Sequence, residues 1–482
     1  MSRSPVANGA MRQRRTSHWH PRRRNEQLPL EEEISLRANG CLERCDVMMQ
    51  ELDSAARSDT IPGERSSSST PHVGFLARIA SSLLLYPGYR RLWISNLFFF
   101  GGLWTQTLVL GWLVFETTRS EFSVALFTAA RLGPMMLGPL AGVISDRFDR
   151  PKLLLAASGW AFAVLSVIAL LVALDKISFW GLVFGGFCIG LAQSPSQPAR
   201  FALVADLVDR EKLSNANALN SLVLSMMQMI GPALGGTMIV AFGAASALAI
   251  SAGWYLVSFV ALWPMRNLKS GRQPDREDGF VSLVASGFRT ISGNVLLRSV
   301  LGVTFLANIL LWPIYQGFMP VIAREHLGLT PQGLGLLLAC AGTGSLAGAL
   351  VIASLGDFRY KGGLFLIGTA IWGGLWATFA LSSSVPLSFA LMGLIGLSAS
   401  PFGILQTTLM LMMTEPHVQG RVMGIQELTI GVMPVSSLLL GSAAEIIGIA
   451  NVALISGTLL AISLAILALR VPELLRYSGH NN

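Results

Sequence analysis

The sequence predicts an all-α polytopic membrane protein with twelve transmembrane helices in two six-helix halves, and three observations lead to this fold class. The 482 residues are 52% hydrophobic and only 13% charged, whereas about 25% of an average soluble domain is charged. Twelve apolar windows each approach the about 20 residues that a helix needs to cross a bilayer core. A long polar stretch, residues 266–298, separates the first six windows from the last six.

Residues 1–72 differ from the rest of the chain, because they are polar and rich in arginine near their start. Such a composition buries too little apolar surface to offset the entropy of ordering, so we expect a disordered basic cytoplasmic tail. Cys41 and Cys45 lie in this tail without a suitably spaced histidine, so no metal site is expected. Residues 73–91 are moderately apolar and end in two arginines, which predicts a segment along the membrane surface.

The apolar windows follow one another from residue 92 to residue 470. Their approximate bounds are 92–115, 123–145, 152–174, 178–203, 214–242, 245–265, 299–322, 332–355, 363–382, 386–413, 421–443 and 449–470. These bounds predict an N-terminal half at 92–265, a cytoplasmic central loop at 266–298, a C-terminal half at 299–470 and a cytoplasmic tail at 471–482.

Basic residues fall unevenly on the connections, and this predicts the orientation. If the N-terminus is inside, the cytoplasmic connections hold seventeen of them: Arg147, Arg150, Lys152, Arg200, Arg210, Lys212, Arg266, Lys269, Arg272, Arg276, Arg289, Arg298, Arg359, Lys361, Arg421, Arg470 and Arg476. The other side holds three: Arg119, Lys176 and Arg324. Because basic residues are retained inside, both termini are expected in the cytoplasm. The net charge of +8 then needs no nucleic-acid partner.

A charged loop after the second window has a degenerate copy in the second half. Asp146 and Asp357 each lie in a basic loop, 211 residues apart, and Arg210 and Arg421 have the same separation. These matches favour a duplicated unit, whose repeats run parallel because six is even.

The loop GVISDRFDRPK, residues 142–152, combines glycines, a carboxylate and basic side chains. Gly138 and Gly142 form a G-x-x-x-G face that permits close helix approach. Asp146, at the inner end of the second span, is expected to accept hydrogen bonds from the N-terminal amides of a neighbouring helix. The basic side chains are suited to pairing with carboxylates or lipid phosphates; they are Arg147, Arg150 and Lys152. Topological anchoring alone is the simpler interpretation, but it does not account for Asp146 and the glycines.

This loop resembles the signature loop of the major facilitator superfamily (MFS). The segments GLAQSPSQPARFALVADLV, NANALNSLVLSMMQMIGPALGG and GRVMGIQELTIGVMPVSSLLLG resemble its branch of siderophore exporters and macrolide efflux pumps. The resemblance covers about residues 86–470. It implies the MFS fold and a loop that latches the two halves in one state, with an acidic residue near the end of the fourth helix. Asp206 matches that place.

The fifth window contains a second motif, GPALGG, which is similar to the core of the family's antiporter motif. Its residues are Gly231, Pro232, Gly235 and Gly236. Proline removes a helix hydrogen bond and glycines allow close packing, so we expect a bend against a neighbouring helix. A simple kink is the alternative, and the family's upstream glycines are absent, since Met227 stands at one such position.

Two ionisable residues lie deep in the windows, namely Arg131 in the second and Glu427 in the eleventh. A charge within the membrane is a functional hypothesis by default, and an interhelical ion pair or snorkelling is its alternative. The fourth span is expected to lack the buried arginine of many proton-coupled drug antiporters, because Arg200 is counted with the inner loop.

The resemblance implies a cavity lined by the first, fourth, seventh and tenth spans. Polar or aromatic residues there include Trp104, Gln106, Trp112, Gln193, Asn308, Trp312, Tyr315, Gln316 and Gln406. A few polar groups among apolar ones suit moderately hydrophobic ligands. For each residue taken singly, packing within the helix bundle is the competing interpretation.

We therefore expect a monomeric secondary transporter of the bacterial inner membrane that exports a drug-like or siderophore-like compound by proton antiport. Its partners would be the small-molecule substrate, protons and membrane lipids, without a cofactor. Lysophospholipid or other amphiphile transport by the same fold, and a non-transporting receptor or scaffold, are the alternatives. An enzyme is not expected, because all six histidines fall in tails or loops and no catalytic cluster is visible.

Overall fold

The computed structural model describes residues 81–137, 149–209, 212–268, 289, 291–355, 358–415 and 418–478. Every element of regular secondary structure among these residues is helical. The tail at 1–72, most of the central loop and the charged positions Asp357 and Arg210 lie outside the described residues.

An N-terminal group of helices covers residues 81–265. Its elements are α3 (Ser81–Leu85), α4 (Pro87–Thr118), α5 (Glu121–Leu132), η1 (Gly133–Leu137), α7 (Arg150–Ala173), α8 (Phe179–Leu207), α9 (Leu213–Leu262) and η2 (Trp263–Met265). Side-chain caps explain several starts: the Ser120 Oγ accepts the Ser123 N–H at 3.1 Å, and the Ser178 Oγ accepts the Gly181 N–H at 3.1 Å.

A C-terminal group covers residues 295–476. Its elements are α11 (Val295–Leu310), η3 (Ile314–Phe318), α12 (Met319–Val321), η4 (Ile322–His326), α13 (Pro331–Ser354), α14 (Lys361–Leu381), α15 (Val385–Met412), α16 (Gln419–Ile430), α17 (Met433–Ile447), α18 (Ile449–Arg470) and α19 (Pro472–Arg476). Asn294 caps α11 by accepting the N–H groups of Leu296 and Leu297. This helix therefore begins four residues before the window expected at 299.

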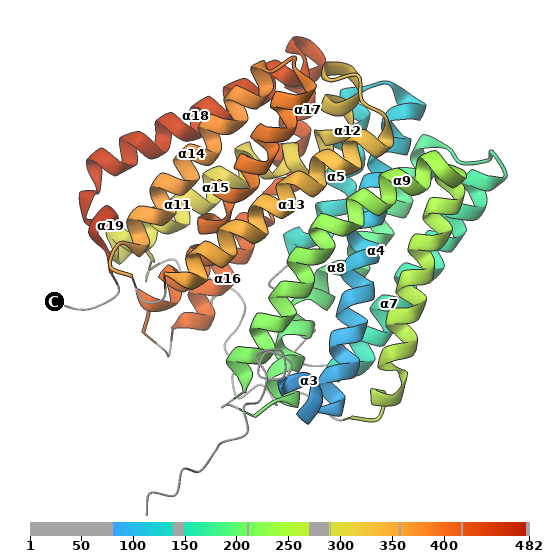
Figure 1. Cartoon of the computed structure of the whole chain (residues 1–482), viewed down its shortest axis with the longest axis horizontal. Coiled ribbons are helices and arrows are strands. Elements are labelled where there is room, and N and C mark those ends of the chain that lie inside the picture. Colours follow the sequence, from blue (N-terminus) through green and yellow to red (C-terminus); the bar gives the residue numbers. More distant parts are fainter. Residues whose placement is uncertain are drawn as a thin grey trace, which may run out of the picture. The chain divides into compact units, whose positions relative to one another are not determined.

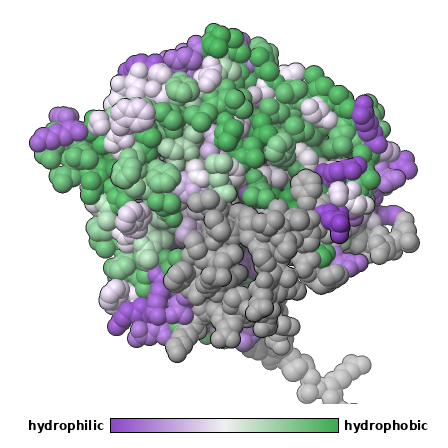
Figure 2. All heavy atoms as spheres, turned by 180° about the vertical axis from the view of Figure 1, so that it is seen from behind, coloured by the Kyte–Doolittle hydropathy of each residue, from purple (hydrophilic) through white to green (hydrophobic). Residues whose placement is uncertain are grey.

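Nine helical runs in the described part of the chain are long and apolar enough to cross a membrane. Many of their large apolar side chains face outward; Leu381 is 69% exposed, for example. Figure 2 shows hydrophobic residues spread over the visible face, with hydrophilic residues gathered toward its margins. A surface of this kind suits lipid rather than water, so the chain is a multi-pass membrane protein.

The longest of the nine runs contains a sharp reversal. Gly243, inside α9, has φ 81° and ψ 166°, and it separates the windows expected at 214–242 and 245–265. Gly448 has φ 81° and ψ 148° between α17 and α18. Both values lie in a region that glycine adopts far more readily than other residues. The expected bend at Pro232 does not break the backbone geometry of α9, because Gly243 is its residue with non-helical angles.

Within each group, neighbouring helices pack along much of their length. In the N-terminal group α9 packs on α4 and α7, and in the C-terminal group α13 packs on α15 and α14 on α18. The two groups meet mainly along α9 and α13 and along α5 and α17 (Figure 1). We call the end of the helices at Thr118, Gly243 and Gly448 the far end, and the end with α3 and α19 the near end.

Candidate functional site

A pocket lies where the two groups meet. Its lining comes from α4, α9, η3, α12 and α13, and consists of Trp104, Thr107, Leu108, Pro232, Tyr315, Gln316, Met319, Pro320, Leu334 and Leu338. Trp104, Tyr315 and Gln316 are cavity residues expected from the sequence, and Pro232 belongs to the GPALGG motif. The wall is largely apolar and aromatic, with the hydroxyl of Thr107 and the amide of Gln316 as polar groups, which is the character of a small-molecule site.

Arg131 lies directly behind the polar side of this pocket. Arg131 is only 3% exposed. It donates one hydrogen bond to Thr107 Oγ1 at 2.9 Å and another to Gln316 Oε1 at 3.3 Å. Thr107 belongs to α4 and Gln316 to η3, so Arg131 connects the two groups across the pocket.

The GPALGG motif presses α9 against helices of both groups. A methyl group at Gly231 would lie 2.7 Å from the Trp104 Cβ, and one at Gly236 would lie 2.2 Å from the Pro331 carbonyl oxygen. The Gly231 carbonyl also accepts a hydrogen bond from Thr105 Oγ1 at 3.0 Å. Gly235 packs against Thr105 as well. The glycines therefore set the close approach of α9 to α4 and α13.

The other expected cavity residues do not line this pocket. Trp312 lies next to it, because its ring packs edge-on against Tyr315 with centroids 5.8 Å apart. Asn308 donates to Thr429 Oγ1 at 3.4 Å, between α11 and α16. The remaining four are buried elsewhere in α4, α8 and α15; they are Gln106, Trp112, Gln193 and Gln406.

Glu427, the second deep ionisable residue, has an exposed side chain on α16. It does not line the pocket with Gln316. The two residues, each expected deep in its span, therefore differ: Arg131 is buried beside the pocket, and Glu427 is exposed away from it.

The near end carries part of the expected charge network. Arg150 Nη1 lies 2.6 Å from Asp206 Oδ2, and these side chains are only 10% and 33% exposed. Lys152 Nζ lies 2.6 Å from Asp149 Oδ2, three residues earlier, and is 63% exposed. The other latch residues, Gly138, Gly142, Asp146 and Arg147, lie outside the described residues. The latch itself stays a prediction.

Arg200 corrects the sequence analysis, which counted it with the inner loop. The helix α8 continues through Pro195 and Pro198 to Leu207, and Arg200 is 0% exposed within it. Its guanidinium donates to Ser95 Oγ at 3.2 Å, to Asn96 Oδ1 and to Ser158 Oγ at 3.4 Å. The fourth predicted span thus does contain a buried arginine.

Neutral groups from three other helices surround this arginine. The Arg200 Cζ lies 3.8 Å from the centroid of the Phe99 ring, which favours a cation by its quadrupole. Asn96 donates to Asn220 Oδ1 at 2.6 Å, and the Ser95 hydroxyl lies 2.7 Å from that of Ser258. Arg200 therefore joins α4, α7 and α8 directly, and reaches α9 through these two further bonds.

At the far end, two glutamates cross between the groups in opposite directions. Glu121 of α5 accepts the N–H of Ile449, the first residue of α18, at 3.0 Å. Glu445 of α17 accepts the N–H of Phe122, in the first turn of α5, at 3.0 Å. Each carboxylate thus caps a helix of the other group, where the helix dipole favours negative charge.

The surroundings of Glu121 raise the pKa of its carboxyl to about 7. Burial is the largest cause, and the charges of Glu325 and Glu445 act in the same direction, while the Ile449 N–H opposes them. The Glu121 Oε2 atom is itself buried and has no hydrogen-bond partner. The Glu121 carboxyl is therefore protonated more readily than an ordinary glutamate while the far ends are in contact.

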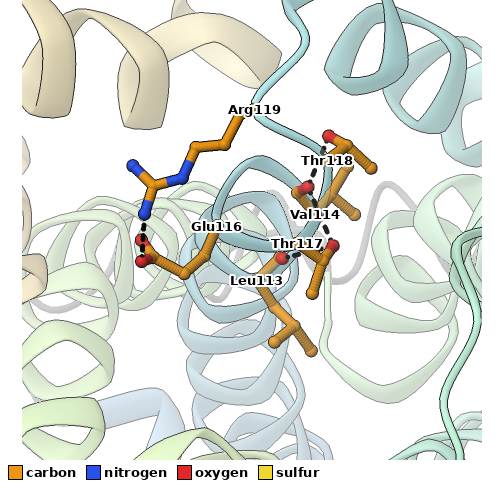
Figure 3. Close-up of polar contacts among 6 residues, drawn as sticks. All are labelled: Leu113, Val114, Glu116, Thr117, Thr118 and Arg119. Atoms are coloured by element: carbon orange, nitrogen blue, oxygen red, sulfur yellow. Dashed lines mark hydrogen bonds and ion pairs between the residues drawn. The ribbon is translucent and has the colours of Figure 1, made fainter.

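The neighbouring end of α4 is held by its own contacts (Figure 3). Glu116 and Arg119 form an ion pair, and Arg119 adopts φ 51° as it ends the helix. The hydroxyls of Thr117 and Thr118 donate to carbonyls one turn earlier in α4. These contacts all lie within the end of α4 and its connection to α5. At this end, Glu121 and Glu445 make the hydrogen bonds between the two groups.

No group of three or more histidine, cysteine, aspartate or glutamate side chains in the described part of the chain is arranged to hold a metal ion. Sequence reasoning missed Glu121, Glu445 and Arg200. The glutamates lie at span ends, where charges are ordinary, and their partners are more than 320 residues away. Arg200 gave no local signal, because the polar partners that a buried charge requires lie 42, 104 and 105 residues away in the sequence.

Several proteins are similar to this chain over most of its length. The multidrug efflux pump Tap of Mycolicibacterium fortuitum is 25% identical over 372 residues, covering 75% of this chain and 88% of that protein. The staphyloferrin A transporter of Staphylococcus aureus is 21% identical over 373 residues, covering 75% and 91%. The enterobactin exporter EntS of Salmonella typhi is 26% identical over 353 residues, covering 72% and 82%.

Solved structures agree with the fold. A POT family transporter matches with a TM-score of 0.69 at 12% identity, over 80% of this chain and 96% of that one. A bacterial homolog of the human lysosomal transporter Spinster, inward-facing and unoccupied, matches with a TM-score of 0.61 at 13% identity, over 84% and 100%. The family profile described as transmembrane secretion effector matches residues 82–477. The chain therefore belongs to the transmembrane secretion effector family of the major facilitator superfamily.

Proposed function

We propose that this protein is a secondary active transporter that exports a small organic compound by alternating access. Twelve spans in two six-helix halves, residues 92–265 and 299–470, would rock about the pocket. The position of that pocket carries the proposal, because α4 and α9 form one wall and η3, α12 and α13 form the other. A ligand between two groups of helices is exposed to one side when the groups part at the near end and to the other when they part at the far end.

The relatives support the direction and the cargo. Tap is an efflux pump, EntS is an exporter, and the staphyloferrin A protein is a transporter, by their names. Export of a drug-like or siderophore-like compound is consistent with the names of these relatives. It also fits a pocket whose wall combines Trp104 and Tyr315 with few polar groups.

The near end is proposed to face the cytoplasm of a bacterial inner membrane. Removing the buried Arg200 from the expected inner charges still leaves sixteen basic residues on that side against three on the other. The pair Arg150 and Asp206 would then stabilise closure of the near end together with the loop at 138–148. Gly138, Gly142, Asp146 and Arg147 keep their proposed latch roles there.

Proton antiport is the proposed coupling. GPALGG packs α9 against α4 and α13, so a change in this packing would be felt by both groups. If proton entry drives export, efflux should collapse when a protonophore is added to energised vesicles. Efflux driven equally well by a sodium gradient alone would contradict proton coupling.

The decisive experiment reconstitutes the full chain in proteoliposomes and measures export of a compound panel selected in an efflux-deficient host. Trp104→Ala should reduce export of the selected compound about tenfold or more, because it removes an aromatic wall of the pocket. Trp180→Ala is the matched control, since Trp180 is 67% exposed and distant in sequence from the lining residues.

The outcomes separate the proposed function from its alternatives. If no compound of the panel is exported but lysophospholipid moves faster between the leaflets, an amphiphile transporter would be favoured. No flux of either kind would favour a receptor or scaffold. Equal export by the Trp104 variant and its control would show that this pocket does not hold the substrate.

A further inference from the structure

The cation at the pocket has no anionic partner among the described residues. Arg131 is 3% exposed, and its two hydrogen bonds reach neutral oxygens of Thr107 and Gln316. Its Nε is buried and has no partner. The residues that line the pocket include no charged side chain. A buried charge served by neutral acceptors alone is costly, and within a membrane it marks a place where a ligand or ion binds.

Arg131 does not itself line the pocket, but it lies one hydrogen bond behind two side chains that do. Thr107 and Gln316 both line the pocket, and Arg131 donates to both. A guanidinium carries five N–H donors in a planar fork that matches a carboxylate with two parallel bonds. The bond to Gln316 is the longer of the two, at 3.3 Å, and is the weaker competitor.

We propose that this pocket takes organic compounds that carry a carboxylate or another oxyanion, and that Arg131 binds the anionic group. The inference rests on the proposed function, in which this pocket holds the substrate. The apolar body of the compound would lie against Trp104, Leu108 and Tyr315, while the anion replaces Gln316 as the partner of Arg131.

The exchange of partners has a mechanical consequence. Arg131 belongs to the N-terminal group and Gln316 to the C-terminal group, so their bond ties the groups in the absence of a ligand. An anion that takes over the guanidinium releases this tie. Ligand binding and loosening of the two groups would then be one event, which is what a substrate-triggered change of state requires.

Binding of three probes to the full chain in lipid nanodiscs tests the inference. 1-Naphthoate, 1-naphthalenemethanol and 1-naphthylmethylammonium share one ring system and differ in charge. Isothermal titration should give an affinity for the carboxylate about tenfold or more above that for the alcohol, and weakest binding for the ammonium.

Variants assign the preference to one side chain. Arg131→Gln should abolish the preference for naphthoate, whereas Arg131→Lys should keep part of it because the charge remains. Gln316→Leu should raise the affinity for naphthoate, because it removes the competing acceptor. Arg119→Gln is the control, since Arg119 is exposed and paired with Glu116 at the far end.

Each outcome bears on the inference alone. Equal binding of the three probes, stronger binding of the ammonium, or no binding of naphthoate would overturn it. If Arg131→Gln does not fold, an unchanged or lower naphthoate affinity in Gln316→Leu would overturn it as well. The proposed function is judged separately by the efflux panel, which includes neutral and cationic compounds.

Discussion

Replacing Glu121 by glutamine is expected to make closure of the far end independent of pH. In the structure, Glu121 accepts the Ile449 N–H across the two groups, and its pKa is raised to about 7, chiefly by burial. When the groups part, the carboxyl meets water and its pKa returns to an ordinary value near 4.3. The closed far end therefore binds a proton more tightly than the open one.

The sign and size of the effect follow from this difference. Because the pKa is raised in the closed state, closure is most favoured below about pH 4.3 and the advantage is lost as the pH rises through about 7. The two pKa values correspond to roughly 3.7 kcal/mol, which solvent screening at this partly exposed site reduces to about 1–2 kcal/mol. The ratio of closed to open molecules should thus rise about 5- to 30-fold on acidification.

Distances between spin labels measure this ratio. Leu174 and Leu381 are exposed at the far ends of α7 and α14, one in each group, and are suitable for labelling in a cysteine-free background. In the parent protein, the short-distance population should grow between pH 8.5 and pH 5.5. Glu121→Gln keeps an acceptor for the Ile449 N–H but cannot titrate, so its population should stay constant.

A matched control and a clear contrary result complete the design. Glu116→Gln removes an exposed carboxylate at the same end that pairs with Arg119, and it should leave the pH response unchanged. Distances that do not respond to pH in the parent protein would refute the reasoning. So would a Glu121→Gln variant that keeps the parental response.

Three further predictions concern the near end, the helix seam and the buried arginine. Arg150→Ala removes one member of the near-end ion pair and should abolish transport in proteoliposomes while folded protein remains; unchanged flux would contradict the latch. Gly236→Ala should cost about 1–3 kcal/mol by overpacking, measured as a lower Tm in detergent, whereas Gly253→Ala in the same helix has free space and should not lower the Tm. Arg200→Lys should cost about 3 kcal/mol, because the compact ammonium lacks the planar fork that reaches three separate acceptors and stacks on the ring, and an equal Tm for the exposed control Arg266→Lys and for Arg200→Lys would disprove this.

Much of the fold could be read from the sequence, because bilayer thickness fixes how long an apolar run must be. The run at α14, Lys361–Leu381, lies within two residues of the window expected at 363–382. Exact ends were harder to place, since polar caps such as Asn294 extend helices beyond their apolar windows. The single-residue turn at Gly243 was not anticipated either, although the two windows that it separates were.

The candidate site was predictable to the extent that depth along a helix is predictable. Arg131 was expected deep in its span because helix rise locates it, and Trp104, Tyr315 and Gln316 were expected in a cavity because the resemblance implies which spans line it. Arg200 was wrongly counted with the inner loop, because it lies near the charged end of the window expected at 178–203. Its partner Asn96 is 104 residues away, so no local pattern announces the contact.

The sequence also left the contacts between the two groups undetermined. Glu121 and Glu445 are each ordinary charges beside an apolar run, and either of them alone predicts a water-exposed helix end. Their significance depends on α5 lying beside α17, which is a property of the folded arrangement. Contacts of this kind become visible only when residues more than 300 positions apart are brought together.

The single-glycine turns at Gly243 and Gly448 also determine where the molecule is stiff. Because a turn of one residue leaves little slack, we expect α9 to behave as a rigid bracket and α17 with α18 as another. Besides these turns there are two other interruptions: α5 continues into the 3₁₀ turn at Gly133–Leu137, and α16 is separated from α17 by Gly431 and Val432. Elastic strain during rocking would concentrate at these interruptions, and backbone amides there should exchange with deuterium faster than those of the brackets.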